Sequence, residues 1–296
     1  MSVGAAGPVS PRSVGFVTCV AWPNISESDA HVARALEARG VAVSGLAWNQ
    51  PDARFDGLDA VIFRASWDYH HAPDAYLAWL ARWEAAGVRF WNPPALIRWN
   101  LTKRYLLDLE RAGVPVIPTV VLDDPAAIHL PAVLAERGWS RAVVKPVLGA
   151  SAHDAARVDA GDVGAVAAAI DGGRLRRPVL VQPFIEEIRT RGEWSLVFID
   201  GALTHAMLKH PGAGDFRVQA HYGGVSARAR ASRDLERAGL RALEALPVSP
   251  LYARVDGVET GDGFLVMEVE VHEPGLFFTA APEAAAAFAE AIIRRL

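Results

Sequence analysis

The chain has 296 residues with a formal net charge of −4, and 51% of them are hydrophobic. That length can bury one large core or two to three small ones. No run of about 18 apolar residues occurs, and the first dozen residues lack the apolar stretch of a signal peptide, which argues against a membrane span or secretion. The single cysteine, Cys19, excludes an internal disulfide and a thiolate metal cluster within one chain. Because no basic run marks a nucleic-acid surface, we expect a cytoplasmic protein with no nucleic-acid or membrane partner.

Lysine is rare in this chain: of the 30 basic residues, only Lys103, Lys145 and Lys209 are lysines. Arginine can replace lysine on any solvated surface, so the bias is most simply genomic. If the bias is genomic alone, the three lysines should be scattered at random with respect to any functional site.

The first hundred residues alternate apolar runs with amphipathic runs, which is typical of an α/β layer with a parallel sheet. We expect a flexible tail over residues 1–12 and an N-terminal α/β domain over residues 13–99. Within it the patterns predict strands at 14–21, 41–48 and 59–65, a helix capped by Ser28 and ended by Gly40, and a helix over 73–87. Helical spacing places Trp79 and Trp83 in the core.

Pro93 and Pro94 interrupt the pattern, and we predict a central domain over residues 100–185 followed by a C-terminal domain over 186–296. The central part is predicted to contain a helical run over 95–113, strands at 115–122, 142–147 and 178–185, and a helix near 163–170. After about residue 186 the patterns become antiparallel, so the fold class is α/β with an α+β C-terminal part. The predicted elements there are a hairpin turning at Asp200–Gly201, a helix over 234–245, a hairpin over 251–271 and a helix over 282–296.

The last hairpin carries three carboxylates. Centring it on Asp262 pairs Asp256 with Glu268 and Arg254 with Glu270, so that Asp256, Glu268 and Glu270 share one face. Such a cluster is repulsive unless it is neutralised, and Arg254 offsets only one charge. Oxygen ligands of this kind suit Mg²⁺ or Mn²⁺, especially together with phosphate and water. The alternative, a solvated polar face on an edge hairpin, stays open.

Two further segments suit an anion. Lys145 ends an apolar strand, and the loop of small residues after it, which includes Gly149 and Ser151, can bring backbone N–H groups close to phosphate. The third lysine, Lys209, opens a glycine-rich run that closes at Arg217 and has the character of a loop that covers a phosphate. No Walker A sequence and no GxGxxG sequence is present.

Jointly and in order, these segments resemble the ATP-grasp ligases, in the branch of glutathione synthetase and ribosomal-protein-S6 glutamate ligase. The resemblance covers roughly residues 100–276 and rests on these strings: Asn100-Leu-Thr-Lys103, Val143-Val-Lys145-Pro146, Gln182-Pro-Phe-Ile185, Met207-Leu-Lys209, Gly214-Asp-Phe-Arg217, Gly223-Gly224, Asp256, and Met267-Glu-Val-Glu270 before Pro274-Gly-Leu. It implies a three-domain ATP-grasp fold in which residues 13–99 lie on the substrate side, 100–185 form a lid and 186–296 carry the metal site.

The resemblance also implies residue roles. ATP would be held by Lys103, Lys145, Gly149, Ser151, Gln182, Phe184, Ile185 and Glu193, with the Ile185 backbone at the adenine and Glu193 at the ribose. Two Mg²⁺ ions would bind Asp256, Glu268 and Glu270, and the catalytic residues would be Arg217, Lys209 and Arg254. Two departures stand out. Glu270 replaces the family's usual asparagine, with Arg254 as its counter-charge, and Val271-His272-Glu273 replaces two small residues beside the acceptor pocket.

A narrower resemblance covers nearly the whole chain. The strings Ser66-Trp-Asp-Tyr69, Asn92-Pro-Pro-Ala95 and Arg98-Trp-Asn-Leu-Thr-Lys-Arg-Tyr105 are similar to a group of ATP-grasp proteins that includes an O-ureidoserine cyclo-ligase.

The implied activity is activation of an amino-acid-like carboxylate as an acyl phosphate, followed by attack of an amine or related nucleophile. Substrate residues are expected beyond a strand end, at Arg64, Ser66, Trp67 and Asp68, together with His221, Gly223 and Gly224. Arg64 would clamp a carboxylate and Asp68 an ammonium, unless the two form a local ion pair. Intramolecular cyclisation and a nucleotide-binding regulator remain alternatives, and a homo-oligomer (dimer or tetramer) is expected.

Overall fold

The computed structural model describes residues 12–123, 130–149, 155–161, 164 and 178–296. The chain divides into two compact units, Met1–Pro94 with Gly275–Leu296, and Ala95–Pro274. Within the described ranges, no helix is long and apolar enough to cross a membrane.

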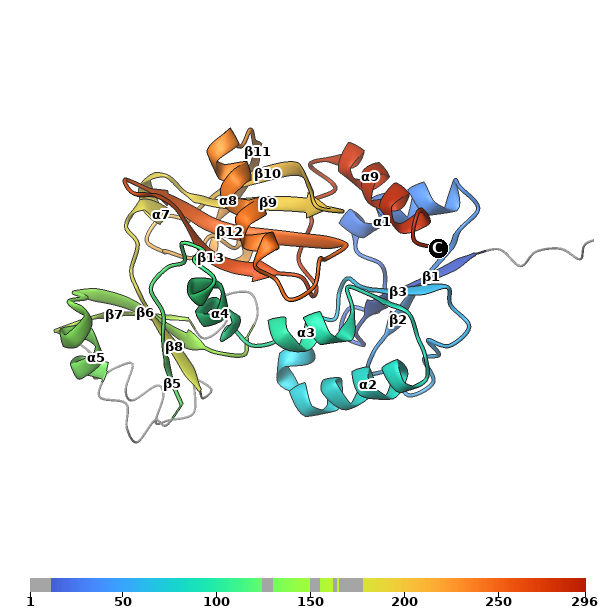
Figure 1. The fold of residues 1–296 in the computed structure, drawn as a ribbon, viewed down its shortest axis with the longest axis horizontal. Coiled ribbons are helices and arrows are strands. Elements are labelled where there is room, and N and C mark those ends of the chain that lie inside the picture. The colour runs from blue at the N-terminus through green and yellow to red at the C-terminus, as the bar shows by residue number, and fades with distance from the viewer. Residues whose placement is uncertain (1–11, 124–129, 150–154, 162–163, 165–177) are drawn as a thin grey trace, which may run out of the picture. The chain divides into compact units, whose positions relative to one another are not determined.

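The first unit is a parallel sheet with strand order β2-β1-β3-β4, covered on one face by α2 and on the other by α1 and α9 (Figure 1). Its elements are β1 (Ser13–Thr18), α1 (Glu27–Glu37), β2 (Ala42–Ala47), β3 (Ala60–Phe63), the 3₁₀ helix η1 (Tyr69–His71), α2 (Pro73–Ala85), β4 (Phe90–Trp91) and α9 (Pro282–Ile293). The strands and helices predicted before residue 90 are confirmed, and so are the buried positions of Trp79 and Trp83.

The cap of α1 differs from the prediction. Ser26, not Ser28, caps the helix, since its hydroxyl accepts a hydrogen bond from the Asp29 N–H at 3.1 Å. The Ser28 hydroxyl accepts instead from the Phe278 N–H at 2.9 Å. A second contact between these ends of the chain joins Arg39 to Glu290 on α9 at 2.6 Å. Residues 275–296 therefore pack in the first unit, whereas the sequence analysis placed them in a domain over 186–296.

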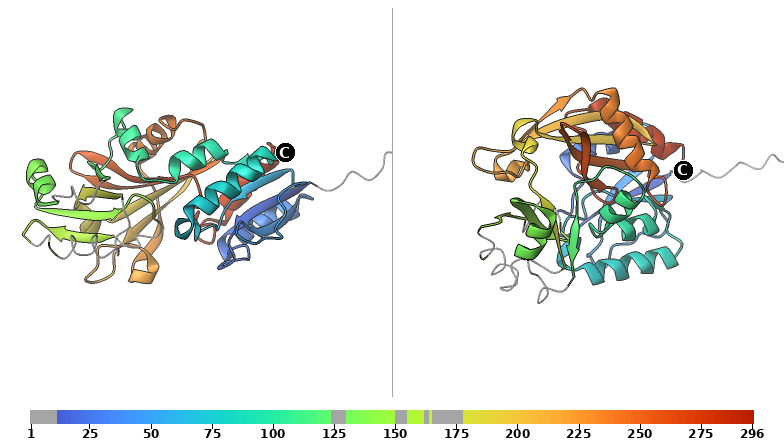
Figure 2. Two further views of the ribbon diagram at one scale, coloured as in Figure 1. Left: turned by 90° about the horizontal axis from the view of Figure 1, so that it is seen from below. Right: turned by 60° about the vertical axis from the view of Figure 1, so that its left-hand side comes forward.

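The second unit contains two antiparallel sheets, with strand orders β11-β10-β9-β12-β13 and β5-β8-β6-β7 (Figure 2). The first consists of β9 (Glu193–Ile199), β10 (Ala202–His210), β11 (Val225–Ala229), β12 (Tyr252–Thr260) and β13 (Gly263–Glu270). The second consists of β5 (Val120–Leu122), β6 (Arg141–Pro146), β7 (Ala156–Asp159) and β8 (Val179–Pro183). The antiparallel part thus begins earlier than residue 186, where the sequence patterns indicated it. Its helices are α3 (Pro94–Asn100), α4 (Tyr105–Arg111), α5 (Leu130–Arg137), α7 (Glu187–Thr190), α8 (Arg233–Glu244) and η2 (Ala220–Tyr222).

The helical run predicted over 95–113 is broken between α3 and α4. The Lys103 N–H donates to the Val147 carbonyl at 2.8 Å, so this amide leaves the helical ladder and binds a distant segment. The break places Lys103 in the connection, where its side chain contacts Glu268 on β13 and Gly149 in the segment after β6. The helix predicted near 163–170 lies, apart from Gly164, outside the described residues.

The strand predicted over 115–122 is divided between the two sheets. Val116 bridges to Val266 on β13, and the Ile117 N–H donates to the Val266 carbonyl at 3.0 Å. Three residues later β5 pairs with β8 in the other sheet. One short segment therefore ties the edge of the five-stranded sheet to the four-stranded sheet.

Candidate active site

The hairpin of β12 and β13 brings the three predicted carboxylates together. Asp256 lies opposite Glu268 and Arg254 opposite Glu270, as the sequence predicted. The turn, however, is Gly261–Asp262, between the pair Thr260 and Gly263, and a β-bulge at Asp256/Gly257 shifts the register back by one residue. A Cβ at Gly257 would lie 2.3 Å from the Phe264 ring, so only glycine fits the bulged strand. Asp256, Glu268 and Glu270 therefore share one face.

Each of these carboxylates forms an ion pair with a basic side chain. The Arg254 guanidinium lies 2.8 Å from Asp256 Oδ2 and 2.5 Å from Glu270 Oε1. Lys103 Nζ lies 2.7 Å from Glu268 Oε1. Arg254 thus contacts two carboxylates with a single positive charge, and Lys103 supplies a second charge to the cluster.

Lys209 and Glu193 form the buried side of the same cluster. They are paired across β9 and β10, with Lys209 Nζ 2.5 Å from Glu193 Oε1 and 3.8 Å from Asp256 Oδ1. The Ser195 hydroxyl donates to Asp256 Oδ1 at 2.5 Å. Lys209 therefore ends a strand as a 7% exposed side chain and does not head an open loop. Glu193, the candidate for the ribose, is bound by this lysine.

Burial and charge act against each other across the cluster. Burial favours the neutral form of Glu270 and, although Arg254 opposes it, raises the pKa of Glu270 to about 8. Burial has the same tendency at Asp256 and Glu268, but Arg254 and Lys209 lower the pKa of Asp256, and Lys103 and Lys145 lower that of Glu268. The cluster thus holds two ionised carboxylates and one whose charge state changes near neutral pH.

The carboxylates suit magnesium as donors but do not form a ready-made cage. Within the described residues no group of three or more His, Cys, Asp or Glu side chains is placed to hold a metal ion by itself. Mg²⁺ is usually bound by one or two carboxylates plus substrate phosphates, so an oxygen set of this kind fits an ion that arrives with a nucleotide. Ligation would require Glu268 and Glu270 to share or exchange their contacts with Lys103 and Arg254.

Lys145 and Gly149 lie beside Lys103. Lys145 projects from β6, opposite Leu180 on β8, and burial lowers its pKa. The Gly149 carbonyl accepts a hydrogen bond from Lys103 Nζ at 2.8 Å. Ser151, the other residue predicted for this loop, lies outside the described residues. The three lysines are therefore not scattered, since Lys103 and Lys209 bind the carboxylates of one cluster and Lys145 interacts electrostatically with Glu268.

The segment predicted to hold the adenine, Gln182 to Ile185, begins in β8 and continues past its end. The Gln182 side chain is buried and donates to the Thr119 hydroxyl at 2.9 Å, and the Phe184 N–H donates to the Arg141 carbonyl at 3.0 Å. Ile185 packs against a small apolar cluster that contains Ile117 and Val258. The end of this segment is therefore apolar and packs against β12 of the five-stranded sheet.

The segment after β10 is organised around Arg217. Its guanidinium donates to both oxygens of Asp215, at 3.0 Å and 2.7 Å, and lies 3.4 Å from the centroid of the Tyr222 ring. These contacts hold the pKa of Asp215 below its usual range. Gly224 is required by packing, since a Cβ there would lie 2.1 Å from the Val218 carbonyl oxygen. Arg217 is therefore held within its own loop, and His221 in the same loop is exposed.

Gly223, beside it, has a positive φ of 81° and ends the 3₁₀ helix. Left-handed backbone of this kind favours glycine, which explains the Gly223-Gly224 pair.

In the first unit, the four predicted substrate residues follow β3. Arg64 is 2% exposed and its Nε donates to Asp29 Oδ1 at 2.9 Å. Asp68 accepts hydrogen bonds from Trp48 Nε1 at 2.6 Å and Asn49 Nδ2 at 2.8 Å. The alternative of a local Arg64–Asp68 ion pair is therefore wrong. Ser66 is buried, and Trp67 packs edge-on against Trp22 with ring centroids 5.7 Å apart.

Sequence reasoning assigned no role to two residues that brace the hairpin. Asn100 Nδ2 donates to the Val269 carbonyl at 2.7 Å, and Asn100 Oδ1 accepts from the Val271 N–H at 3.1 Å. The Tyr105 hydroxyl accepts from the Val269 N–H at 3.0 Å. Both stood in the Asn100–Tyr105 string, but side-chain bonds to a distant strand leave no periodic signal.

Comparisons with known proteins identify the family of the chain. Residues 142–289 match the family model described as RimK-like ATP-grasp domain, and residues 14–92 match the N-terminal domain of D-cycloserine synthetase DcsG. The chain is 34% identical over 275 residues to the cycloserine biosynthesis protein DcsG of Streptomyces lavendulae, covering 87% of this chain and 90% of that protein.

Solved structures show the same fold. The crystal structure of D-cycloserine synthetase DcsG matches with a TM-score of 0.84 and 29% identity over 96% of this chain and 99% of that one. D-alanine–D-alanine ligase from Bacillus anthracis matches with a TM-score of 0.72 and 15% identity over 96% and 97% of the two chains. The chain belongs to the RimK-like ATP-grasp family and is an ATP-dependent carboxylate–amine ligase.

Proposed function

We propose that this ligase activates a small amino-acid-like carboxylate as an acyl phosphate and couples it to an amine or related nucleophile. The terminal phosphoryl group of ATP passes to the carboxylate, and attack of the nucleophile on the acyl carbon then expels phosphate, so the products are the amide, ADP and phosphate. The observation that supports this most directly is the contact of Lys103 with Glu268, because it joins the lysine proposed for phosphate to a carboxylate proposed for the metal in one partly buried site.

In this proposal Asp256, Glu268 and Glu270 hold two Mg²⁺ ions, which would neutralise the phosphates when bound. Lys103 and Lys145 bind phosphate oxygens, and the backbone around Gly149 and Ser151 adds N–H donors. The apolar segment of Gln182, Phe184 and Ile185 receives the adenine. Lys103 exchanges Glu268 for phosphate as the nucleotide arrives, so its charge stays paired throughout.

Glu193 is proposed to bind the ribose, which requires it to share or exchange its contact with Lys209. Lys209 and Arg254 act by holding Glu193, Asp256 and Glu270 in position. Arg217 would leave Asp215 and turn to the transferring phosphoryl group. Lys103 and Arg217 would each exchange a carboxylate for a phosphate group, and the Asp215 carboxylate, whose side chain is 22% exposed, would be left to solvent.

Substrate residues are proposed in both units: Arg64, Ser66, Trp67, Asp68, His221, Gly223 and Gly224. Asp29 accepts a hydrogen bond from Arg64 Nε and so orients the guanidinium. A substrate carboxylate would then bind the other N–H groups of Arg64. Asp68 is proposed for a substrate ammonium.

A second candidate is intramolecular ring closure, in which the nucleophile belongs to the activated molecule. Its support is the similarity to the cycloserine protein DcsG across both units, including the N-terminal domain match over residues 14–92. The shape of the acceptor pocket would decide between ring closure and ligation of two molecules. Val271-His272-Glu273 replaces two small residues of the family pattern beside this pocket; His272 is buried, and its Nδ1 lies 3.1 Å from Glu273 Oε2.

The test is a screen of amino acids and their O- and N-substituted derivatives for ADP release with Mg²⁺, with hydroxylamine present in a parallel series. We expect one class to stimulate ADP release and to yield a hydroxamate. A product equal in mass to the substrate less one water identifies cyclisation, and a product that joins two substrates identifies ligation. Absence of ADP release across the panel, or of any hydroxamate, would contradict the acyl phosphate.

The compartment and assembly are also proposals. The single cysteine supports a cytoplasmic enzyme. A dimer or tetramer is proposed and is tested by light scattering of the purified protein.

A further inference from the structure

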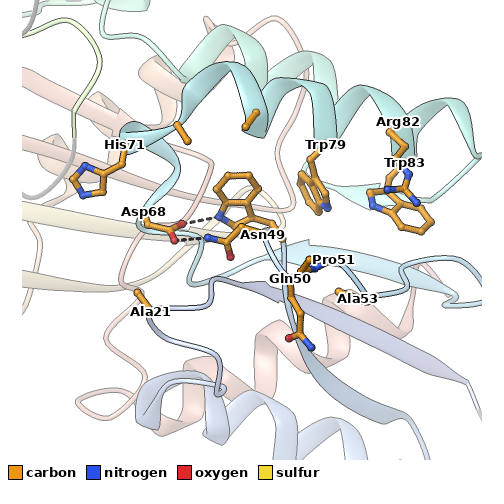
Figure 3. A pocket seen from close by; sticks show the side chains of 13 residues that line it. Ala21, Asn49, Gln50, Pro51, Ala53, Asp68, His71, Trp79, Arg82 and Trp83 are labelled. Carbon is orange, nitrogen blue, oxygen red and sulfur yellow. Dashed lines mark hydrogen bonds between the residues drawn. The ribbon is translucent and has the colours of Figure 1, made fainter.

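A cavity of about 650 Å³ lies entirely within the first unit, between α2 and the segment that follows β2. It shares no residue with the carboxylate cluster of the second unit. Figure 3 shows Asp68 and Asn49 at one end, Arg82 and Trp83 at the other, and Trp79 between them.

One end of the cavity carries an unneutralised carboxylate. Asp68 is partly buried, and its oxygens accept from Trp48 Nε1 and Asn49 Nδ2, which are both neutral donors. In the part of the chain that the structure describes, no basic side chain forms an ion pair with it. Two neutral hydrogen bonds orient the carboxylate but leave its charge for a ligand to meet.

The walls are aromatic. Trp48, Trp79 and Trp83 line the cavity and are 7%, 9% and 4% exposed. Indole faces attract cations as well as apolar groups, so they suit an organic cation better than a hydrated metal ion. The Arg82 guanidinium already stacks 4.8 Å from the Trp83 ring, which shows that these faces accept a cation.

Trp79 also supplies an unused donor. Its Nε1 is buried and has no hydrogen-bond partner among the described residues. A buried N–H without an acceptor is costly, and a ligand that brings an acceptor would remove that cost. The carboxylate and the aromatic walls define the class of ligand, an organic cation, and the Trp79 N–H favours members of that class that also carry an acceptor.

From these features we infer that the cavity binds a small organic amine, with its ammonium on Asp68 and its apolar body along Trp48 and Trp79. Binding of the amine is inferred from the cavity alone. Its role rests on the proposed function: the amine is either the nucleophile of the ligation or an effector. Binding itself requires no nucleotide.

The test compares 2-phenylethylamine with its neutral counterpart 2-phenylethanol by calorimetric titration of the full-length protein without ATP. We expect the amine to bind about tenfold more tightly or better, since a charge-assisted hydrogen bond separates the two probes. Asp68→Asn should remove this preference and leave the affinity for the alcohol unchanged, which also reports that the cavity is intact. Asp52→Asn, an exposed carboxylate in the neighbouring loop, is the matched control and should keep the preference.

Equal binding of amine and alcohol by the natural protein, or a preference that survives Asp68→Asn, would overturn the assignment. A repeat with ATP, Mg²⁺ and a carboxylate substrate distinguishes the two uses: an amine consumed in step with ADP is the nucleophile, and one that changes the rate without being consumed is an effector. Failure of ligation with intact amine binding would count against the proposed function and not against this site.

Discussion

Lys103 Nζ lies 2.7 Å from Glu268 Oε1 and 2.8 Å from the carbonyl oxygen of Gly149. A single ammonium thus joins the carboxylate hairpin to the segment after β6. Burial opposes its charge, yet Glu268 and Glu270 raise the pKa of Lys103, so the residue stays cationic. This contact makes Lys103 the most sensitive position at which to test the proposed nucleotide site.

Replacing Lys103 by arginine should impair ATP binding even though the charge is kept. A planar guanidinium needs more room than an ammonium, and Lys103 is enclosed by Glu268 and Gly149. We expect the KM for ATP to rise by about tenfold or more, equivalent to ~1.4 kcal/mol. Steady-state ADP release measures it, and an unchanged KM would remove Lys103 from the phosphate site.

Glu268→Gln tests the hairpin as a metal site. Glutamine keeps an oxygen for Lys103 but loses the charge that Mg²⁺ requires, so turnover should fall by about 100-fold or more while thermal unfolding shifts little. Glu259→Gln is the matched control, because Glu259 lies on the same hairpin and accepts a hydrogen bond from Trp194 Nε1 at 2.9 Å. Equal rates in the two variants would exclude Glu268 as a ligand.

The register of the carboxylate hairpin could be predicted from the sequence because strand alternation and a short turn leave few choices. The prediction succeeded through two compensating features: the turn centre lies half a residue earlier than expected, and the bulge at Gly257 restores the pairing of Asp256 with Glu268. Helices and strands of the first unit were predictable for a related reason, since their apolar periodicity and glycine stops are local.

The charge partners could not be predicted in the same way. Lys103 meets Glu268, and Arg64 meets Asp29, across long stretches of sequence, and nothing in the local pattern distinguishes them from solvated residues. The break between α3 and α4 was missed because the apolar spacing continues through Leu101, whereas the bond from the Lys103 N–H to Val147 that ends the helix is tertiary. The packing of α9 in the first unit was hidden likewise, because an alanine-rich helix shows a buried face but not its partner.

Asn100 should act as a positioning residue for the hairpin. Its side-chain amide satisfies the Val269 carbonyl and the Val271 N–H, which flank Glu270. Asn100→Ala removes the side-chain partner of both backbone groups, and we expect the free energy of unfolding in urea to fall by about 2–4 kcal/mol. Tyr105→Phe, which removes only the acceptor for the Val269 N–H, should cost about 1 kcal/mol.

A positioning role predicts a second effect of Asn100→Ala. The Mg²⁺ concentration for half-maximal activity should rise in this variant. In Asn100→Asp, which keeps the acceptor for the Val271 N–H, this concentration should rise less. If Asn100→Ala lowers stability without changing the Mg²⁺ dependence, Asn100 braces the fold and does not position the ligands.

The raised pKa of Glu270 predicts how the stability of the metal-free protein depends on pH. In the unfolded chain this carboxyl ionises near 4.5, whereas burial raises its pKa in the folded protein to about 8. Between these values the folded state keeps a proton that the unfolded state has lost, so the free energy of unfolding falls as pH rises through that window. From pH 6 to pH 8 the loss should be about 2 kcal/mol. Glu270→Gln cannot ionise and should lack this loss, while every other titrating group stays common to both proteins. Urea unfolding at the two pH values in the presence of EDTA measures the difference, and parallel slopes for both proteins would show that Glu270 is already ionised at pH 6.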